Sequence, residues 1–311
     1  MGARNQGSQH PRRVSIAMSG NFAELKPTMP GPDPAPRRPR TAFPADACDC
    51  HAHVFGPQRQ YPFAPTAGYV PAPASIEAYV KMLRTIGCER AVIVQPSAYG
   101  TDNRCTVDAL RSGKFAFRGV AVIEEKTTDS QLEDMHQAGV RGVRLNVKSK
   151  GSIYSIDSAP RLAQRIKARG WHLQFFLDAR TLPNLDRRLA GLPVDIVIDH
   201  FGHIDVADGL QAPAFQTLLR LAHNERCWFK LIGPYRISKK PPKYSDVTPF
   251  ARALLEIAPD RCVWGTDWPH PNTDFVPNDG DLADILLDWI PDEQLRRRVL
   301  ADNPARLYDF R

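Results

Sequence analysis

Residues 47–57 read ACDCHAHVFGP and place two histidines, His51 and His53, at the end of a short apolar run. On a β-strand, residues two apart point to the same face, so both imidazoles are expected to face one space. Imidazole serves both as a metal ligand and as a general acid or base. The stretch therefore predicts a buried strand that ends in a pair of functional histidines.

Seven further runs resemble this one, and longer amphipathic stretches separate them. This alternation is typical of βα units and a parallel sheet. Eight strands, each followed by a helix, predict a single-domain α/β fold, the (β/α)8 TIM-type barrel of about 250 residues. The expected strands are ACDCHAHV (47–54), RAVIVQP (90–96), FRGVAVI (117–123), VRGVRLN (140–146), HLQFFLD (172–178), VDIVIDH (194–200), RCWFKLI (226–232) and RCVWGTD (261–267). The expected helices include 75–86, 130–137, 159–169, 182–189, 214–223, 249–257, 281–289 and 291–301, the connection after residue 123 leaving room for only a short one.

The first 44 residues differ in composition from the rest. They contain seven basic and two acidic residues, a net charge of +5 out of +7 for the chain. They are rich in Pro, Gly and Arg and show no helix or strand period, which predicts a disordered tail over 1–44 before a barrel over 45–311. The tail lacks an aromatic stacking platform and a regular basic stripe, so we expect no nucleic-acid partner.

The remaining features favour a cytoplasmic protein. Arg12-Arg13 faintly resembles a twin-arginine signal, but the segment after it is too short and polar for the apolar part of an export signal. No run of eighteen apolar residues exists, so we expect no membrane span. The six cysteines form no Cys-x-x-Cys pair, which fits a reducing compartment. The oligomeric state stays open.

Polar side chains gather at the predicted carboxyl ends of the strands, where such barrels carry their chemistry. Histidine, arginine and carboxylate dominate the set, and these side chains serve acid–base catalysis and anion binding. The set consists of His51, His53, Gln95, Ser97, Arg144, Asn146, Asp178, Asp199, His200, Lys230 and Asp267.

The order of these residues resembles the amidohydrolase superfamily: a His-x-His pair after the first strand, His200 after the sixth and Asp267 after the eighth. The flanking words look like the branch that contains 2-pyrone-4,6-dicarboxylate lactonase. These words are DCHAHVFGP (49–57), YPFAP (61–65), QPSAYGTDN (95–103), VRGVRLN (140–146), DHFGHID (199–205) and WGTDWPHPN (264–272). The resemblance implies a carboxylic-ester hydrolase that opens a small anionic lactone to a hydroxymuconate-type tricarboxylate, a step in aromatic catabolism.

The resemblance also implies roles for individual residues. It makes Asp267 the general base for water and places His51, His53 and His200 around the lactone carbonyl oxygen. Phe176 stands where a tyrosine would be expected, which puts the exact substrate in doubt. The residues expected to bind substrate are Tyr69, Ser97 and Arg144 at family positions, Lys150 and His203 near positions of expected arginines, Arg236 after strand seven, and His270 in place of an asparagine.

A metal site is not expected. Mononuclear members of the superfamily add a histidine at the end of strand five, but His172 lies at the start of that run. Binuclear members add a bridging group after strand four, which ends here in Asn146. We therefore expect no cofactor. If zinc is bound, its ligands are His51, His53 and Asp267, because three protein ligands suffice for a catalytic site.

Three alternatives stay open. The first is a lactonase or lactone isomerase for a sugar acid or a muconolactone, with the same histidines and a changed set of cations. The second is a zinc-dependent decarboxylase of the same superfamily. The third is a binding protein that acts through its basic tail.

Overall fold

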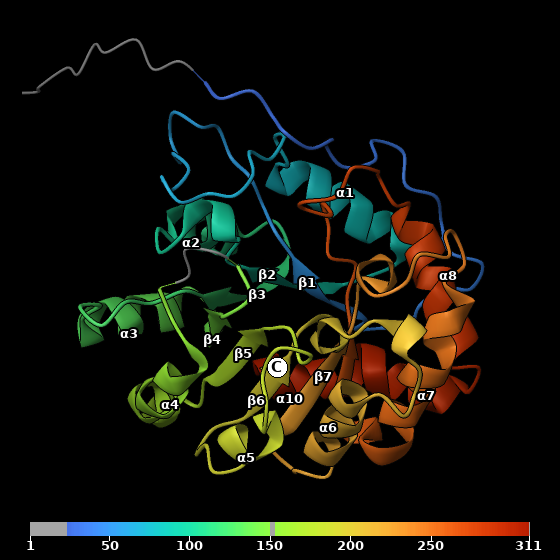
Figure 1. Cartoon of the computed structure of the whole chain (residues 1–311). Helices are drawn as coiled ribbons and strands as arrows, with labels where there is room; N and C mark the ends of the chain where they lie inside the picture. The colour runs from blue at the N-terminus through green and yellow to red at the C-terminus, as the bar shows by residue number, and fades with distance from the viewer. Residues whose placement is uncertain (1–23, 150–152, 311) are drawn as a thin grey trace, which may run out of the picture.

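The computed structural model describes residues 24–149 and 153–310. Eight parallel strands form one sheet in the order β1 to β8, and a parallel bridge between Ala52 and Trp268 joins its two edges. The predicted (β/α)8 barrel is confirmed (Figure 1). Each predicted strand overlaps an observed one, and β3 begins one residue earlier than predicted. The strands are β1 (Cys48–Ala52), β2 (Arg90–Val94), β3 (Ala116–Ala121), β4 (Val140–Asn146), β5 (His172–Phe176), β6 (Ile196–Ile198), β7 (Cys227–Leu231) and β8 (Cys262–Trp264).

The helices surround the sheet (Figure 1). Every predicted helical stretch overlaps a helix, and α2 and α10 are additions. The buried face of α2 includes Cys105, Thr106 and Ala109, small residues that give a weak apolar period. None of the helices in the described ranges has the length and apolar composition that a membrane span needs. The helices are α1 (Ile76–Ile86), α2 (Arg104–Arg111), α3 (Asp129–Gln137), α4 (Ala159–Ile166), α5 (Leu185–Leu189), α6 (Pro213–Ala222), α7 (Thr248–Ile257), α8 (Asp279–Trp289), α9 (Glu293–Arg297) and α10 (Asn303–Tyr308).

Local sequence explains where these elements begin and what they bury. The strands are nearly continuous apolar runs because a parallel sheet covered by helices is buried on both faces. Strand β7, CWFKL, is buried at every position, Lys230 included. Helix α3 begins at a capping box in which Thr128 and Gln131 satisfy each other's backbone N–H groups. The capping box fixes the start of the short helix that the sequence predicts after residue 123.

The segment 24–44 contains no helix or strand and runs past α1 to α8 (Figure 1). Arg37 donates to Asp281 at 2.5 Å and also pairs with Asp284, and Arg40 pairs with Asp288 at 2.8 Å. This part of the predicted disordered tail therefore contacts the barrel through ion pairs. The remainder of the predicted tail, residues 1–23, lies outside the described residues.

Candidate active site

The His-x-His pair and Asp267 meet where the barrel closes. Asp267 N–H donates to the His51 carbonyl at 2.8 Å, and His53 N–H donates to the Trp268 carbonyl at 2.7 Å. This approach needs glycine at position 265, because an added Cβ would lie 2.7 Å from the His51 backbone nitrogen. Asp267 itself has a φ of 66°, a left-handed conformation that residues other than glycine seldom adopt and that clusters at functional sites.

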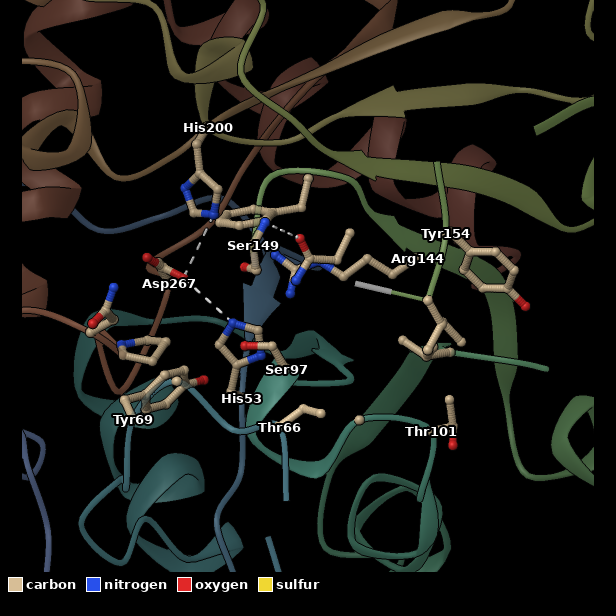
Figure 2. Close-up of a pocket in the computed structure, with 18 of the residues that line it drawn as sticks. His53, Thr66, Tyr69, Ser97, Thr101, Arg144, Ser149, Tyr154, His200 and Asp267 are labelled. Atoms are coloured by element: carbon tan, nitrogen blue, oxygen red, sulfur yellow. Dashed lines mark hydrogen bonds and ion pairs between the residues drawn. The ribbon is translucent and has the colours of Figure 1, made fainter. Parts of the chain in front are cut away.

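One oxygen of Asp267 faces three imidazoles. Its Oδ1 lies 3.8 Å from His51 Nε2, 3.7 Å from His53 Nε2 and 4.0 Å from His200 Nε2. Figure 2 shows His53 and His200 on two sides of this carboxylate. No hydrogen bond from the described residues reaches Oδ1. A buried carboxylate oxygen is thus presented to whatever binds between the histidines.

The other oxygen of Asp267 is held by a cation and a phenol. Arg236 Nε donates to Oδ2 at 2.7 Å, and Tyr235 donates to the same oxygen at 2.9 Å. Burial raises the pKa of Asp267, but the Arg236 guanidinium together with the surrounding histidines outweighs burial and holds this pKa well below its usual range. Asp267 is therefore ionised at neutral pH. Tyr235 was not among the predicted site residues.

Replacing Arg236 is expected to move the acid limb of the pH profile. A carboxylate with a depressed pKa loses its charge only when the pH falls through that pKa. In Arg236→Met the ion pair is gone and burial still acts, so the pKa of Asp267 rises and kcat/KM declines at a higher pH than in the wild type. Arg236→Lys keeps a cation and should shift the limb less. An acid limb that does not move in folded Arg236→Met would refute this electrostatic role.

Burial also keeps the three histidines neutral. It lowers the pKa of His53, and it lowers that of His200 well below the ordinary value. For His51, burial and then the nearby Lys230 ammonium lower the pKa to about 3. Each ring therefore carries one N–H and one bare nitrogen at neutral pH.

His270 lies behind Asp267 and is not among the residues that line the pocket. Its Nδ1 is 3.0 Å from the Tyr235 hydroxyl, and its Nε2 is 3.2 Å from the buried Asp279 carboxylate at the start of α8. The predicted contact of His270 with substrate is not supported by this placement. The side chain instead reaches Asp267 through Tyr235.

A charged network forms the floor of the site. Asp199 Oδ2 accepts from Arg144 Nε at 3.2 Å and from Gln174 Nε2 at 3.1 Å. Lys230 donates to the Cys50 carbonyl and to Gln174 Oε1, both at 2.8 Å. Burial lowers the pKa of Lys230 to about 8, with Asp199 acting in the opposite direction. Lys230 is thus still mainly charged at neutral pH.

A pocket of about 320 Å³ opens above these groups. Arg144 and Ser97 lie beside His53, and Tyr69 lies near Asp267, whereas Tyr154 is set apart from Asp267 (Figure 2). Of the predicted substrate-binding residues, the pocket brings together Tyr69, Ser97, Arg144 and Arg236 with the catalytic candidates His53, His200 and Asp267.

Two further predicted residues lie off the pocket, and a third is outside the described residues. His51 is fully buried beneath the pocket and does not line it. His203 is also buried off the pocket, where its Nδ1 contacts the Leu177 carbonyl at 2.9 Å and its ring packs edge-on against Phe176. Lys150 lies outside the described residues. A dicarboxylate needs a cationic or donor group for each of its two carboxylates. His203 is not placed to bind the second one.

The candidate zinc ligands are close together, but their surroundings do not suit a dication. Ligand atoms of His51, His53 and Asp267 lie within 4.8 Å of one another. However, Arg236 already pairs with Asp267, and Lys230 Nζ lies 3.2 Å from His51 Nδ1. Metal-bound histidines normally direct their second nitrogen at an acceptor such as a carbonyl or carboxylate. An ammonium in that place opposes metal binding.

Comparison with known proteins identifies the family. The model of the amidohydrolase family matches residues 48–310 of the chain. The chain belongs to the amidohydrolase family. The match covers the whole barrel and includes the His-x-His pair, His200 and Asp267, so the predicted superfamily is confirmed.

Individual relatives support the predicted branch. The chain is 40% identical to the 2-pyrone-4,6-dicarboxylate hydrolase of Comamonas testosteroni, over 88% of this amidohydrolase and 93% of that protein. It is 38% identical to the 4-sulfomuconolactone hydrolase of Hydrogenophaga intermedia, over 94% and 98% of the two chains. A crystal structure of an apo protein from Agrobacterium tumefaciens superposes with a TM-score of 0.79 at 31% identity, over 88% of this chain and 99% of that one.

Proposed function

We propose that this amidohydrolase is a carboxylic-ester hydrolase that opens a small anionic lactone, with 2-pyrone-4,6-dicarboxylate as the leading substrate. The observation that carries the proposal is the Asp267 carboxylate, which Arg236 keeps ionised while its free oxygen faces the imidazoles of the pocket. A carboxylate in this setting can take a proton from water. The 40% identity to a hydrolase named for this substrate supports the choice of lactone.

The reaction consumes one water molecule. As the water oxygen bonds to the lactone carbonyl carbon, one proton passes to Asp267 and the carbonyl electron pair moves onto its oxygen. Collapse of this tetrahedral intermediate re-forms the carbonyl and breaks its bond to the ring oxygen. The ring oxygen leaves as an enolate and takes the proton from Asp267. The products are an enol and a carboxylic acid, and Asp267 is again a carboxylate.

The developing negative charge needs donors near the carbonyl oxygen. We propose His200 for this task, because it lines the pocket with its Nε2 4.0 Å from Asp267 Oδ1. Removal of one such donor typically lowers kcat by about 10²–10³-fold. The enolate is a good leaving group, so this stabilisation can suffice without a Lewis acid.

Arg144 is proposed to bind a carboxylate of the substrate. Its guanidinium is buried at the inner end of the pocket, where it stacks on Phe176 at 4.7 Å and pairs with Asp199. Arginine presents several N–H groups in a planar fork, so one guanidinium can serve Asp199 and a bound carboxylate together. Tyr69 and Ser97 also line the pocket and supply hydroxyl groups.

The second candidate is a lactonase for a substituted muconolactone. One observation favours it, the 38% identity to a 4-sulfomuconolactone hydrolase. The pocket wall includes Val122, Ile153 and Phe176, against which the ring of such a lactone can pack while its carboxylate binds Arg144.

A panel of lactones tests the proposal. Disappearance of the pyrone-ring ultraviolet absorbance measures hydrolysis of 2-pyrone-4,6-dicarboxylate, and parallel assays use 4-sulfomuconolactone and a sugar-acid lactone. We expect kcat/KM for the dicarboxylate to exceed that for the others. A preference for the sulfonated lactone would favour the second candidate. No hydrolysis of any lactone in the panel would refute the proposed function.

A further inference from the structure

The two histidines of strand β1 meet opposite kinds of group at the same ring atom. His53 Nδ1 lies 2.7 Å from the Val94 carbonyl oxygen, which can only accept a hydrogen bond. His51 Nδ1 lies 3.2 Å from Lys230 Nζ, and an ammonium can only donate. Hence Nδ1 carries the hydrogen in His53 but is bare in His51. A neutral imidazole has one hydrogen on its two nitrogens. His51 therefore carries its hydrogen on Nε2, whereas Nε2 of His53 is bare.

The contacts of Lys230 support its role as the donor. Its three hydrogens have three acceptors, because the Cys50 carbonyl and Gln174 Oε1 lie at 2.8 Å and His51 Nδ1 completes the set. Asp199 fixes the orientation of the Gln174 amide by accepting from its Nε2. Asp199 Oδ1 lies 3.4 Å from His51 Nδ1 and 3.8 Å from Lys230 Nζ, and the ammonium is the charged donor nearest to it on this side.

We propose that Lys230 and the Val94 carbonyl hold His51 and His53 in opposite tautomers, and that this divides their tasks in hydrolysis. His53 Nε2 and Asp267 Oδ1 are both acceptors and lie 3.7 Å apart. One donor with two hydrogens satisfies both, and the hydrolytic water is such a donor. In this assignment His51 Nε2 carries a hydrogen and lies 3.8 Å from the same oxygen. His51 and Lys230 are therefore positioning residues for the base.

The same arrangement would oppose the binding of a metal ion. A histidine binds zinc through a bare nitrogen. His53 offers one at Nε2, but His51 does not while Lys230 occupies its Nδ1. Removing the ammonium would let the His51 hydrogen move to Nδ1, where Asp199 can accept it. The His-x-His pair would then present two bare nitrogens beside Asp267.

Nitrogen-15 NMR of the histidine rings tests the tautomers in the wild-type protein. Long-range ¹H–¹⁵N spectra distinguish protonated from bare ring nitrogens, and His51→Gln and His53→Gln each identify one set of signals by their loss. We expect a protonated Nε2 in His51 and a protonated Nδ1 in His53. The same tautomer in both rings, or an imidazolium in either, would overturn the proposal. The tasks of the residues rest on the proposed function, whereas this readout needs no turnover.

Metal binding by a Lys230 variant gives a second test. Lys230→Met is expected to bind about one zinc ion per chain by elemental analysis and titration calorimetry, with an affinity at least about tenfold above that of the wild type. Lys126→Met, which alters an exposed lysine side chain, is the matched control and should behave as the wild type. Equal zinc binding by the wild type and Lys230→Met would overturn the proposal. The NMR measurement needs no change at Lys230, so it decides the matter even if this variant does not fold.

Discussion

Asp267→Asn is expected to lower kcat for lactone hydrolysis by about 10²–10⁴-fold, the usual contribution of a general base. The amide keeps the size of the side chain, and its one oxygen can take the place of Oδ2 and accept from Tyr235 and Arg236. It cannot take the proton of the attacking water. The Michaelis constant should change little, because Arg144 rather than Asp267 is proposed to bind the substrate anion. Steady-state kinetics with the pyrone dicarboxylate measure both quantities.

Tyr235→Phe is the matched control for this variant. It removes one hydrogen bond to Asp267 Oδ2 but leaves the carboxylate and its Arg236 partner in place. Its loss of kcat should be far smaller than that of Asp267→Asn. Circular dichroism and thermal melts confirm that both variants are folded. Near-normal turnover by folded Asp267→Asn would remove Asp267 from the role of base.

Arg144→Met is expected to raise KM for a carboxylated lactone by about ten- to a hundredfold. A hydrogen bond to a charged group contributes about 1.5–3 kcal/mol, and about 1.4 kcal/mol corresponds to a factor of ten. Methionine preserves much of the contact with Phe176 but presents no donor. The variant also leaves Asp199 with Lys230 as its nearby cation, 3.8 Å away, so some loss of stability should accompany the change in KM.

Arg144→Lys separates charge from shape at this position. It retains a cation but loses the planar fork, so its KM should lie between those of the wild type and Arg144→Met. Thermal melts report the cost of disturbing Asp199 independently of substrate. An unaltered KM in folded Arg144→Met would mean that the substrate carboxylate is bound elsewhere in the pocket.

The fold could be predicted because its signals are local. Each strand is a short apolar run buried on both faces, and each run is followed by polar residues and a helical period. Helices α2 and α10 were not predicted. In α2, Thr106 occupies the buried face, where it donates to Gln95, and weakens the apolar pattern. The residues at strand ends were predicted for the same reason, because the carboxyl ends of parallel strands meet at one side of a barrel.

The contacts between those residues could not be predicted from sequence. The spacing of the His-x-His pair shows that both rings share a face, but not that one Nδ1 meets a carbonyl and the other an ammonium. Tyr235 precedes Arg236 in a segment whose sequence has no periodic pattern. Its contact with Asp267 depends on how the connection after β7 is folded, which the sequence does not indicate. His270 follows Asp267 by three residues, yet a left-handed turn directs it behind the carboxylate.

Hydrolysis by metal-depleted enzyme tests the central claim most directly, namely that side chains alone activate water and the lactone carbonyl. The enzyme is treated with chelator, its metal content is verified by elemental analysis, and the loss of pyrone absorbance is followed with and without added zinc. We predict the same kcat/KM for the 2-pyrone-4,6-dicarboxylate before and after metal removal, with no gain from zinc. Activity that is lost with the metal and restored by stoichiometric zinc would contradict the account.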